Sequence, residues 1–314
     1  MRMMFARKSR SSQSPINLAT SPGCVVAVQL AAVPVAGRPQ LGVAAYLGSK
    51  APVAERLDLM AREVRVKHAH LNILLEGADY QFLQVEMPAV PEEELKTALR
   101  WQVKDMLSHP LDAVTLDVLP PSDGPAGRRS SGYVVSATNR LLRERMMQFR
   151  AYDSDVAVID VPEMAQRNLA DCLEDPGHAT AVLSLTPGGC LLTASRDGAL
   201  YFTRSFELST LSLAASPSAR RDQFDRLVLE LQRSVDVLDH QFSFLAVSTL
   251  WIAPFSQCEE LLSLLIESLY LPVKIINLAE IFDCSRCQLP SDQDQQAALF
   301  HALGMSLRDV EETP

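Results

Sequence analysis

The stretch TAVLSLTPGGCLLTASRDGALYFTR, residues 180–204, decides the fold. Its apolar segments are separated by a Pro-Gly-Gly turn at 187–189 and an Asp-Gly turn at 197–198, so it predicts three consecutive strands. Glycines between two apolar strands either make an ordinary hairpin or let the backbone approach a phosphate group. Much of the functional interpretation depends on which of these the first turn does.

The composition is that of a folded, acidic protein. The chain has 314 residues, of which 47% are hydrophobic, enough for one large or two ordinary domains. A net charge of −9 provides no uniformly basic surface for a phosphate backbone, which argues against a nucleic-acid-binding protein. No apolar run approaches the ~18–20 residues of a membrane-spanning helix. The longest run, residues 25–37, contains Gln29 and Pro34, so we expect a cytoplasmic protein.

The cysteines offer one weak motif. Most of the six lie alone in apolar surroundings, as reduced core thiols do. Cys284 and Cys287 have the spacing of a redox pair or of half a zinc site, but no second pair completes four zinc ligands. A redox or metal protein built on these two residues is therefore a distant alternative.

Outside the opening stretch, predicted strands alternate with predicted helices, which indicates an α/β protein. Residues 1–20 are Ser-rich with four basic residues and are predicted to form a mobile tail. Strand pairs near 24–47 and 180–204 each open a similar run of helices and strands. A duplicated α/β unit opened by paired strands is the plan of the actin-like ATPases, whose nucleotide lies between the two halves.

Three helices are well marked by start signals and apolar stripes, at 91–107, 162–173 and 220–244. Asp160 and Glu163 flank the start of the second helix. Capping of that helix accounts for both side chains without a catalytic acid/base pair.

Four segments together resemble one family. They are DYQFLQVEMPAVPEEELKTALRWQVKDML at 79–107, VIDVPEMAQRNLA at 158–170, LVLELQRSVDVLDHQF at 227–242 and HALGMSLR at 301–308. In this order and spacing the chain, from about residue 20 to residue 308, is similar to the MshI proteins of the mannose-sensitive haemagglutinin (MSHA) type IV pilus. These proteins are in turn similar to PilM of other type IV pilus systems.

The resemblance implies a duplicated actin-like α/β fold (ASKHA, ribonuclease-H-like) with a first half at 21–160 and a second half at 161–314. An inserted α/β subdomain would interrupt the first half at about 79–131. The resemblance also implies a cytoplasmic adaptor, peripheral to the inner membrane, that docks on the pilus assembly platform. Its partner would be the N-terminal peptide of a PilN-like protein, here the MshJ counterpart. Other platform proteins and a second copy of the chain are further expected partners.

Many such relatives bind ATP between the halves, but the metal-binding signature is missing here. Actin-like ATPases carry Asp-x-Gly in each hairpin, because the carboxylate holds the Mg²⁺ shell and the glycine admits the phosphates. No aspartate occurs from residue 21 to residue 57. Ser184 and Thr186 stand where Asp and Gly are expected, and Pro187 lacks a backbone N–H. We therefore expect no catalytic residues, no metal ligands, no resident cofactor and no ATP hydrolysis.

A nucleotide-binding switch or weak ATPase of the same fold, using ATP and Mg²⁺, is the alternative function. Its candidate contacts are Gly188 and Gly189 in the turn, Glu230 and Arg233 at the ribose and base, and Gly304 in a turn near the adenine. The residues by themselves allow a simpler interpretation. Glu230 and Arg233 would form a surface ion pair, and Gly304 would let a helix and a strand pack closely.

Two features suggest partner contacts. The peptide bound by PilM relatives carries an Ile-Asn-Leu core, and Ile16, Asn17 and Leu18 repeat it in the predicted tail. The hypothesis is that the tail occupies the partner groove of its own molecule or of a neighbour; a chance tripeptide is the alternative. Trp101 lies off the apolar stripe of helix 91–107, where it either anchors an interface or packs on the neighbouring sheet.

Overall fold

Two five-stranded sheets of the same plan form the body of the molecule. The computed structural model describes residues 14–119 and 131–308. In each sheet three antiparallel strands are followed by two parallel ones, with the orders β3-β2-β1-β4-β8 and β11-β10-β9-β12-β13. The strands of the first sheet are β1 (Ile16–Ser21), β2 (Cys24–Leu30), β3 (Leu41–Gly48), β4 (His70–Leu74) and β8 (Asp155–Asp160). Those of the second are β9 (Ala179–Thr186), β10 (Gly189–Arg196), β11 (Ala199–Phe206), β12 (Val247–Ile252) and β13 (Val273–Ile275).

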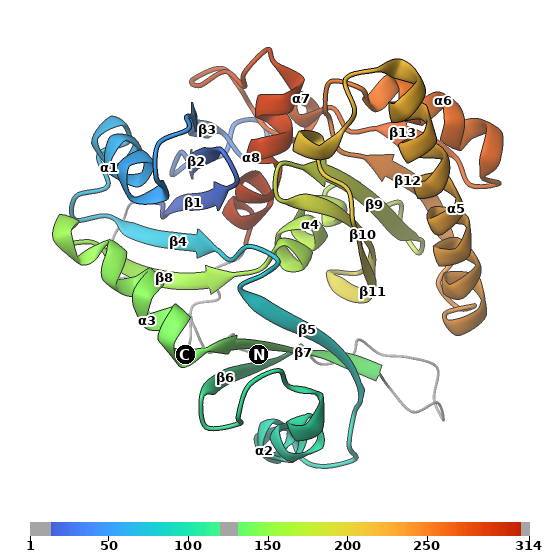
Figure 1. Ribbon diagram of the computed structural model, residues 1–314, viewed down its shortest axis with the longest axis horizontal. Helices are drawn as coiled ribbons and strands as arrows, with labels where there is room; N and C mark the ends of the chain where they lie inside the picture. The colour runs from blue at the N-terminus through green and yellow to red at the C-terminus, as the bar shows by residue number, and fades with distance from the viewer. Residues whose placement is uncertain (1–13, 120–130, 309–314) are drawn as a thin grey trace.

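A third, smaller sheet is inserted in the first half. Its strands are β5 (Tyr80–Glu86), β6 (Val114–Leu119) and β7 (Ser131–Thr138), in the order β5-β7-β6. Helix α2 (Glu92–Gln102) and the short helix η1 (Lys104–Met106) lie between β5 and β6 in the chain. This subdomain was predicted at about 79–131, and its last strand runs on to Thr138. Figure 1 shows it below the two large sheets.

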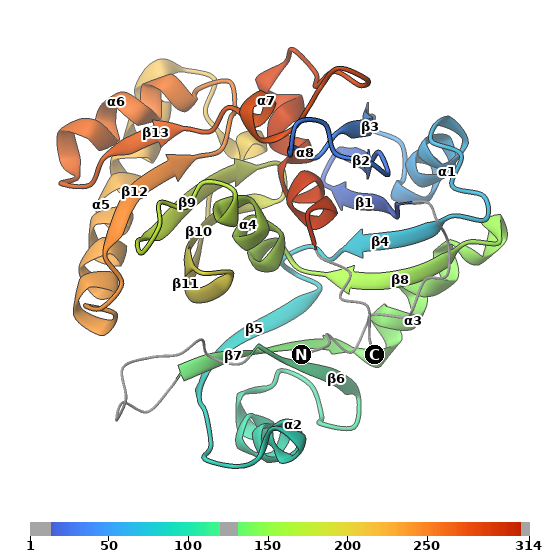
Figure 2. The same ribbon diagram turned by 180° about the vertical axis from the view of Figure 1, so that it is seen from behind.

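The remaining helices cover and join the large sheets. They are α1 (Val53–Glu63), α3 (Asn139–Gln148), η2 (Arg150–Tyr152), α4 (Pro162–Asp171), η3 (Thr210–Ser212), α5 (Pro217–Gln241), α6 (Cys258–Ser268), α7 (Leu278–Ile281) and α8 (Gln293–Ser306). Helices α4 and α8 lie together between the sheets, as Figures 1 and 2 show from opposite sides. Every residue of α8 from Ala297 to Met305 is buried, as expected for a helix surrounded by protein. One apolar core cluster therefore includes residues of both halves.

The first strand corrects a prediction. The mobile tail predicted up to residue 20 is wrong for residues 16–20, because they form β1 in the middle of the first sheet. Asn17 is buried and satisfied there: its amide nitrogen donates to the Val28 carbonyl at 3.2 Å, and its oxygen accepts from Asn72 at 2.9 Å. Residues 1–13 of the predicted tail lie outside the described residues.

The predicted absence of a membrane span can be tested on the described helices. Within residues 14–119 and 131–308, no helix is both long enough and apolar enough to cross a bilayer.

Candidate functional site

Two equivalent hairpin turns meet between the halves. The turn from Ser21 to Cys24 joins β1 to β2, and the turn from Thr186 to Gly189 joins β9 to β10. A Cβ added at Gly188 would lie only 3.5 Å from Ser21 Oγ, so the two turns are in contact range. In an actin-like architecture, this meeting point is the candidate nucleotide site. The strand of the first half that corresponds to β9 is thus β1, so the first hairpin begins one strand earlier than the strand pair predicted near 24–47.

The second turn uses its own polar groups. The Gly188 N–H donates to Thr186 Oγ1 at 3.2 Å, and the Thr186 hydroxyl donates to the Gly189 carbonyl at 3.2 Å. Pro187 has no N–H to offer. Anion binding at such a turn requires backbone N–H groups that point at the ligand. Because Gly188 already has an internal acceptor, a phosphate would have to displace the Thr186 hydroxyl first.

Ser184, at the position of the expected aspartate, faces the protein interior. Its hydroxyl lies 3.2 Å from Nε2 of His301 on α8, and Ser184 is fully buried. The same imidazole nitrogen lies 3.3 Å from Oε1 of Gln166 on α4. Burial lowers the pKa of His301 to about 4, so the ring is neutral near pH 7. The position is therefore occupied by a neutral hydrogen-bond network rather than by a metal-binding carboxylate.

Gln166 connects α4 to the second sheet. Its amide nitrogen lies 2.7 Å from the Val182 carbonyl, 3.2 Å from the Leu191 carbonyl and 3.0 Å from Thr193 Oγ1. Gln166 is fully buried, so these contacts satisfy a polar group that would otherwise be costly to bury. Neither Gln166 nor His301 was predicted to belong to the site. For His301 a signal was available, since it is the one polar residue in the apolar run AALFHALGM at 297–305, whereas Gln166 is followed directly by Arg167 and Asn168 and has no such signal.

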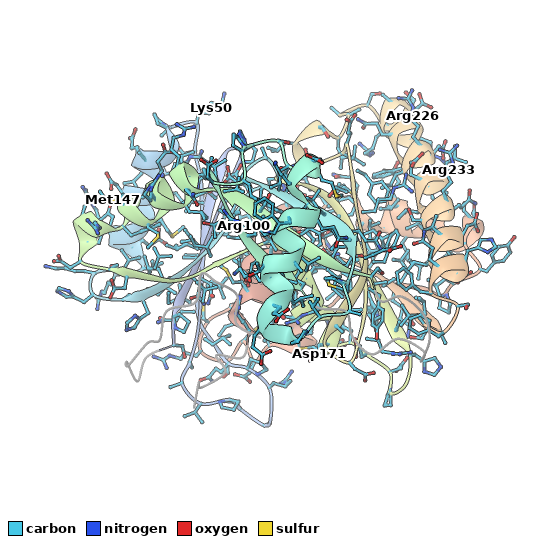
Figure 3. The ribbon with its side chains drawn as sticks, turned by 90° about the horizontal axis from the view of Figure 1, so that it is seen from below. Lys50, Arg100, Met147, Asp171, Arg226 and Arg233 are labelled. Atoms are coloured by element: carbon cyan, nitrogen blue, oxygen red, sulfur yellow. The ribbon has the colours of Figure 1, made fainter. Side chains whose placement is uncertain are left out.

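Glu230 and Arg233 form an ion pair on α5. Arg233 Nη1 lies 2.5 Å from Glu230 Oε1, and Arg204 of β11 pairs with the other oxygen of the same carboxylate. This confirms the predicted ion pair and adds Arg204, which also donates to Ser234 Oγ at 3.1 Å. Figure 3 shows Arg226 and Arg233 along α5. A role of Glu230 and Arg233 in ribose or base contacts stays a prediction.

Gly304 lies inside α8, not in a turn as predicted. Its α-carbon faces α4, where an added Cβ would be 2.0 Å from the Ala165 carbonyl oxygen. The Asn168 side chain donates to the Gly304 carbonyl at 3.0 Å. The glycine therefore lets two helices approach closely, which is the packing role expected of it, although the neighbour is a helix and not a strand.

A buried polar cluster joins the inserted subdomain to α4. Tyr80, the first residue of β5, donates to Glu163 Oε2 at 2.6 Å, and both side chains are largely buried. Burial raises the pKa of Glu163 to about 7. Next to it, Asp160 pairs with Arg308 at 3.0 Å. The predicted capping role is wrong, because the N-cap residue of α4 is Val161 and no side chain caps the helix. Asp160 and Glu163 instead have partners far away in the chain, which the local helix-start signal could not reveal.

The inserted subdomain also contacts the second sheet. Tyr133 of β7 donates to the Tyr201 carbonyl of β11 at 2.8 Å. At the entry to the subdomain, Asp79 pairs with Arg145 of α3 at 2.7 Å. The subdomain is therefore hydrogen-bonded to both halves, although its chain connections lie in the first half alone.

Of the predicted partner residues, one is exposed and three are buried. Trp101 is 66% exposed on α2, so its side chain is free to contact a partner rather than packed on the neighbouring sheet. Ile16, Asn17 and Leu18 are buried in β1. The hypothesis that they enter a partner groove is wrong, because leaving β1 would remove the centre of the first sheet.

Cys284 and Cys287, the two cysteines with the spacing of a redox pair, are free thiols. In the part of the chain that the structure describes, no group of three or more His, Cys, Asp or Glu side chains is placed to hold a metal ion. Burial raises the pKa of Cys284, which disfavours the reactive thiolate. Nothing in this geometry supports a redox or metal site at Cys284 and Cys287.

No protein-family model matches the chain, and no curated protein sequence matches it. Among solved structures it is similar to a chain of a PilM–PilN type IV pilus biogenesis complex, with a TM-score of 0.78 and 19% identity over 96% of this chain and 100% of that one. It is also similar to a Bacteroides thetaiotaomicron protein with an actin-like ATPase fold (TM-score 0.50, 11% identity, 89% of this chain and 95% of that one). A third similar structure is the cytoplasmic domain of EpsL, an inner-membrane component of the type II secretion system of Vibrio cholerae (TM-score 0.50, 15% identity, 92% and 93%). The predicted actin-like fold is confirmed.

Proposed function

We propose that this protein is a PilM-like adaptor of a type IV pilus, specifically of the MSHA type. It would act in the cytoplasm, peripheral to the inner membrane, by binding the N-terminal peptide of a PilN-like protein, the MshJ counterpart. The observation that carries the proposal is the end-to-end likeness to the chain from the PilM–PilN complex, which leaves almost no part of either chain unmatched. The MSHA assignment is supported by the four sequence segments at 79–107, 158–170, 227–242 and 301–308.

The adaptor function predicts saturable binding of a labelled peptide from the N-terminus of the PilN-like partner, measured by fluorescence anisotropy. A scrambled peptide should not bind. If Trp101 anchors the interface, Trp101→Ala should weaken binding at least about tenfold, since buried aromatic anchors dominate interface energies. Tyr270→Ala is the matched control, because Tyr270 is a fully exposed aromatic in the second half. If the unmodified protein does not bind the peptide, the partner assignment is refuted. If the two variants bind the peptide with equal affinity, only the role of Trp101 as an interface anchor is excluded.

The nucleotide-binding switch is kept as a second candidate because the two hairpin turns meet between the halves, with Gly188 against Ser21. The internal hydrogen bond of Gly188 and the buried Ser184–His301 pair favour the adaptor without ATP hydrolysis. A ligand that binds the native state raises stability by RT ln(1 + [L]/Kd), about 2.7 kcal/mol at one hundred times Kd.

We therefore expect the thermal unfolding midpoint to be the same in millimolar Mg-ATP as in Mg²⁺ alone, which is the control. A rise of several degrees with Mg-ATP, absent from a Gly188→Val variant of unchanged basal stability, would establish the switch instead. Val at this position would place side-chain atoms against Ser21 and obstruct a phosphate.

A further inference from the structure

Strand β3 lacks the protection that the other edge strands carry. It is the last strand of the first sheet, on the side away from the inserted subdomain, as Figures 1 and 2 show. Its sequence LGVAAYLG contains no Asp, Glu, Lys, Arg or His. Charged side chains on an edge strand prevent it from pairing with another chain. Each of the other edge strands in the described sheets has at least one: β5 (Glu86), β6 (Asp117), β8 (Asp155, Asp160), β11 (Arg204) and β13 (Lys274).

The edge of β3 lies in an uncharged part of the chain. From the start of β2 to the end of β3 the one charged residue is Arg38. Arg38 pairs with Asp283 at 3.9 Å and donates to a main-chain carbonyl of α7 at 3.1 Å. Two acids near the strand, Asp292 and Asp294, accept main-chain N–H hydrogen bonds at 2.8 and 3.0 Å. Lys50, beyond the end of β3, is exposed and has the opposite charge.

Both faces of β3 are covered by the protein's own core. Ala45 and Leu47 pack on the core cluster of the first half. Ala44 and Tyr46, on the other face, pack on the cluster that includes α8. A further strand would therefore find a place at the edge of β3, where its side chains would continue the same two layers.

The outer edge of β3 presents main-chain groups without partners. The Ser49 N–H donates to the main chain before β2 at 2.9 Å. Alternate residues of an antiparallel strand face the same neighbour, so Ala44, Tyr46 and Gly48 direct their N–H and C=O groups away from β2. Among the described residues, no hydrogen bond joins these outward groups to another segment. The first residue of the strand is different, because its N–H donates to the Asp283 carbonyl at 3.0 Å.

The open part of β3 is complementary to itself. In an antiparallel pair of two copies centred on Ala45, each Val43 lies opposite Leu47 of the other copy, and each Ala44 lies opposite Tyr46. The two branched apolar side chains would meet on one face, and a small residue would face a large one on the other. The outward main-chain groups of Ala44 and Tyr46 would exchange both of their hydrogen bonds. A two-fold interface requires this property, because the same surface serves both copies.

We propose that two copies of this protein pair through their β3 edges, in antiparallel register about Ala45, and so form a symmetric dimer with one continuous sheet. A peptide strand from another protein could also use an open edge, but it would give no reason for β3 to match its own reverse. A ladder of this length buries little surface, so we expect a weak dimer that dissociates on dilution. The proposal is independent of the adaptor function, because the pairing needs no partner peptide.

Sedimentation velocity of the full chain over a range of concentrations tests the self-association. We expect the mass to rise from that of the monomer to that of the dimer and no further, because the pairing uses up the open edge. Ala44→Pro should raise the dimer dissociation constant at least about tenfold, since it removes an outward N–H donor from each copy. The monomer should tolerate this change, because proline is accepted on edge strands where the N–H faces outward. Ala44→Ser keeps the N–H and is the matched control, which should dimerise as the unmodified protein does.

A cysteine at the centre of the ladder tests the register without the proline variant. Residues that face each other as a non-hydrogen-bonded antiparallel pair have α-carbons about 4.5 Å apart, within the range of a disulfide. Ala45→Cys should therefore give at least about fivefold more crosslinked dimer under mild oxidation than Ala44→Cys, the neighbouring control on the other face. The unmodified protein, with its six native cysteines, gives the background.

Several results would overturn the β3 dimer. They are a protein that stays monomeric at all concentrations, assemblies larger than a dimer, equal dimerisation of Ala44→Pro and Ala44→Ser, and equal crosslinking of Ala45→Cys and Ala44→Cys. Binding of the PilN-like peptide, measured in parallel by fluorescence anisotropy, separates this interface from the adaptor function. We expect Ala44→Pro to bind the peptide with unchanged affinity. If Ala44→Pro loses the peptide while circular dichroism shows an intact fold, the edge belongs to the peptide and the dimer is overturned.

Discussion

Gly304→Ala is expected to lower the free energy of unfolding by about 3 kcal/mol. The new Cβ would lie 2.0 Å from the carbonyl oxygen of Ala165 and 2.7 Å from its carbonyl carbon. Both are backbone atoms of α4, so no side-chain rotation relieves the contact and the two helices must move apart. Forcing extra volume into a packed core typically costs about 1–3 kcal/mol and sometimes more. The better helix propensity of alanine offsets only about 1 kcal/mol of it.

Urea denaturation of the variant and of a matched glycine variant measures this effect. Gly77→Ala is the control, because a Cβ added at Gly77 meets nothing within 4 Å. We expect Gly77→Ala to stay within about 0.5 kcal/mol of the unmodified protein, as surface substitutions do. Equal stabilities of the two variants would contradict the close approach of α4 and α8. Because these helices lie between the two sheets, Gly304→Ala should also loosen the junction of the halves.

Glu163→Gln is expected to make the protein more stable at pH 8, by up to about 3 kcal/mol. Glu163 is only 4% exposed, and burial raises its pKa from 4.5 to about 7. The folded state therefore binds a proton more tightly than the unfolded state does. The stability from this group is fully present below pH 4.5 and is lost as the pH rises through 7. Glutamine does not titrate and still offers Tyr80 an acceptor oxygen.

Urea denaturation from pH 5 to pH 8 measures the free energy of unfolding of Glu163→Gln and of the unmodified protein. The quantity to follow is the difference between these two free energies. It should be smallest at pH 5 and grow as the pH rises toward 7. The buried His301 adds an opposite slope, because its lowered pKa removes stability as the pH falls from 6.5 toward 4. That slope is the same in both proteins and cancels. Glu144→Gln, at an exposed carboxylate, is the charge-matched control. A variant less stable than the unmodified protein at pH 8 would show that the Tyr80 bond to a charged carboxylate dominates.

The second half was the part of the fold best predicted from local pattern. The three consecutive strands predicted within residues 180–204, with turns at 187–189 and 197–198, correspond to β9, β10 and β11. Apolar runs separated by Pro-Gly-Gly and Asp-Gly turns leave little freedom of interpretation. The long helix predicted at 220–244 is α5, displaced by three residues at each end.

Strand β1 was missed for a physical reason. Its sequence INLATS follows a Ser-rich segment and contains Asn17, a residue that is unfavourable inside a sheet. Burial of Asn17 is tolerated because the side chain of Asn72, from β4, completes its hydrogen bonds. A polar pair separated by 55 residues leaves no signal in either local pattern.

The sequence and the tertiary structure each determine a different part of the candidate site. The sequence by itself determined what is missing, since Ser184 and Thr186 cannot supply a metal-binding carboxylate and Pro187 cannot supply an N–H. Only the tertiary structure decided what replaces it: a neutral His301 and Gln166 under Ser184, and an internal bond for the Gly188 N–H. Composition and local spacing determine which chemistry a chain can offer. Which groups meet is decided by long-range packing, because the buried polar partners come from separate elements of the chain, 117 residues apart for Ser184 and His301 and 135 residues apart for Gln166 and His301.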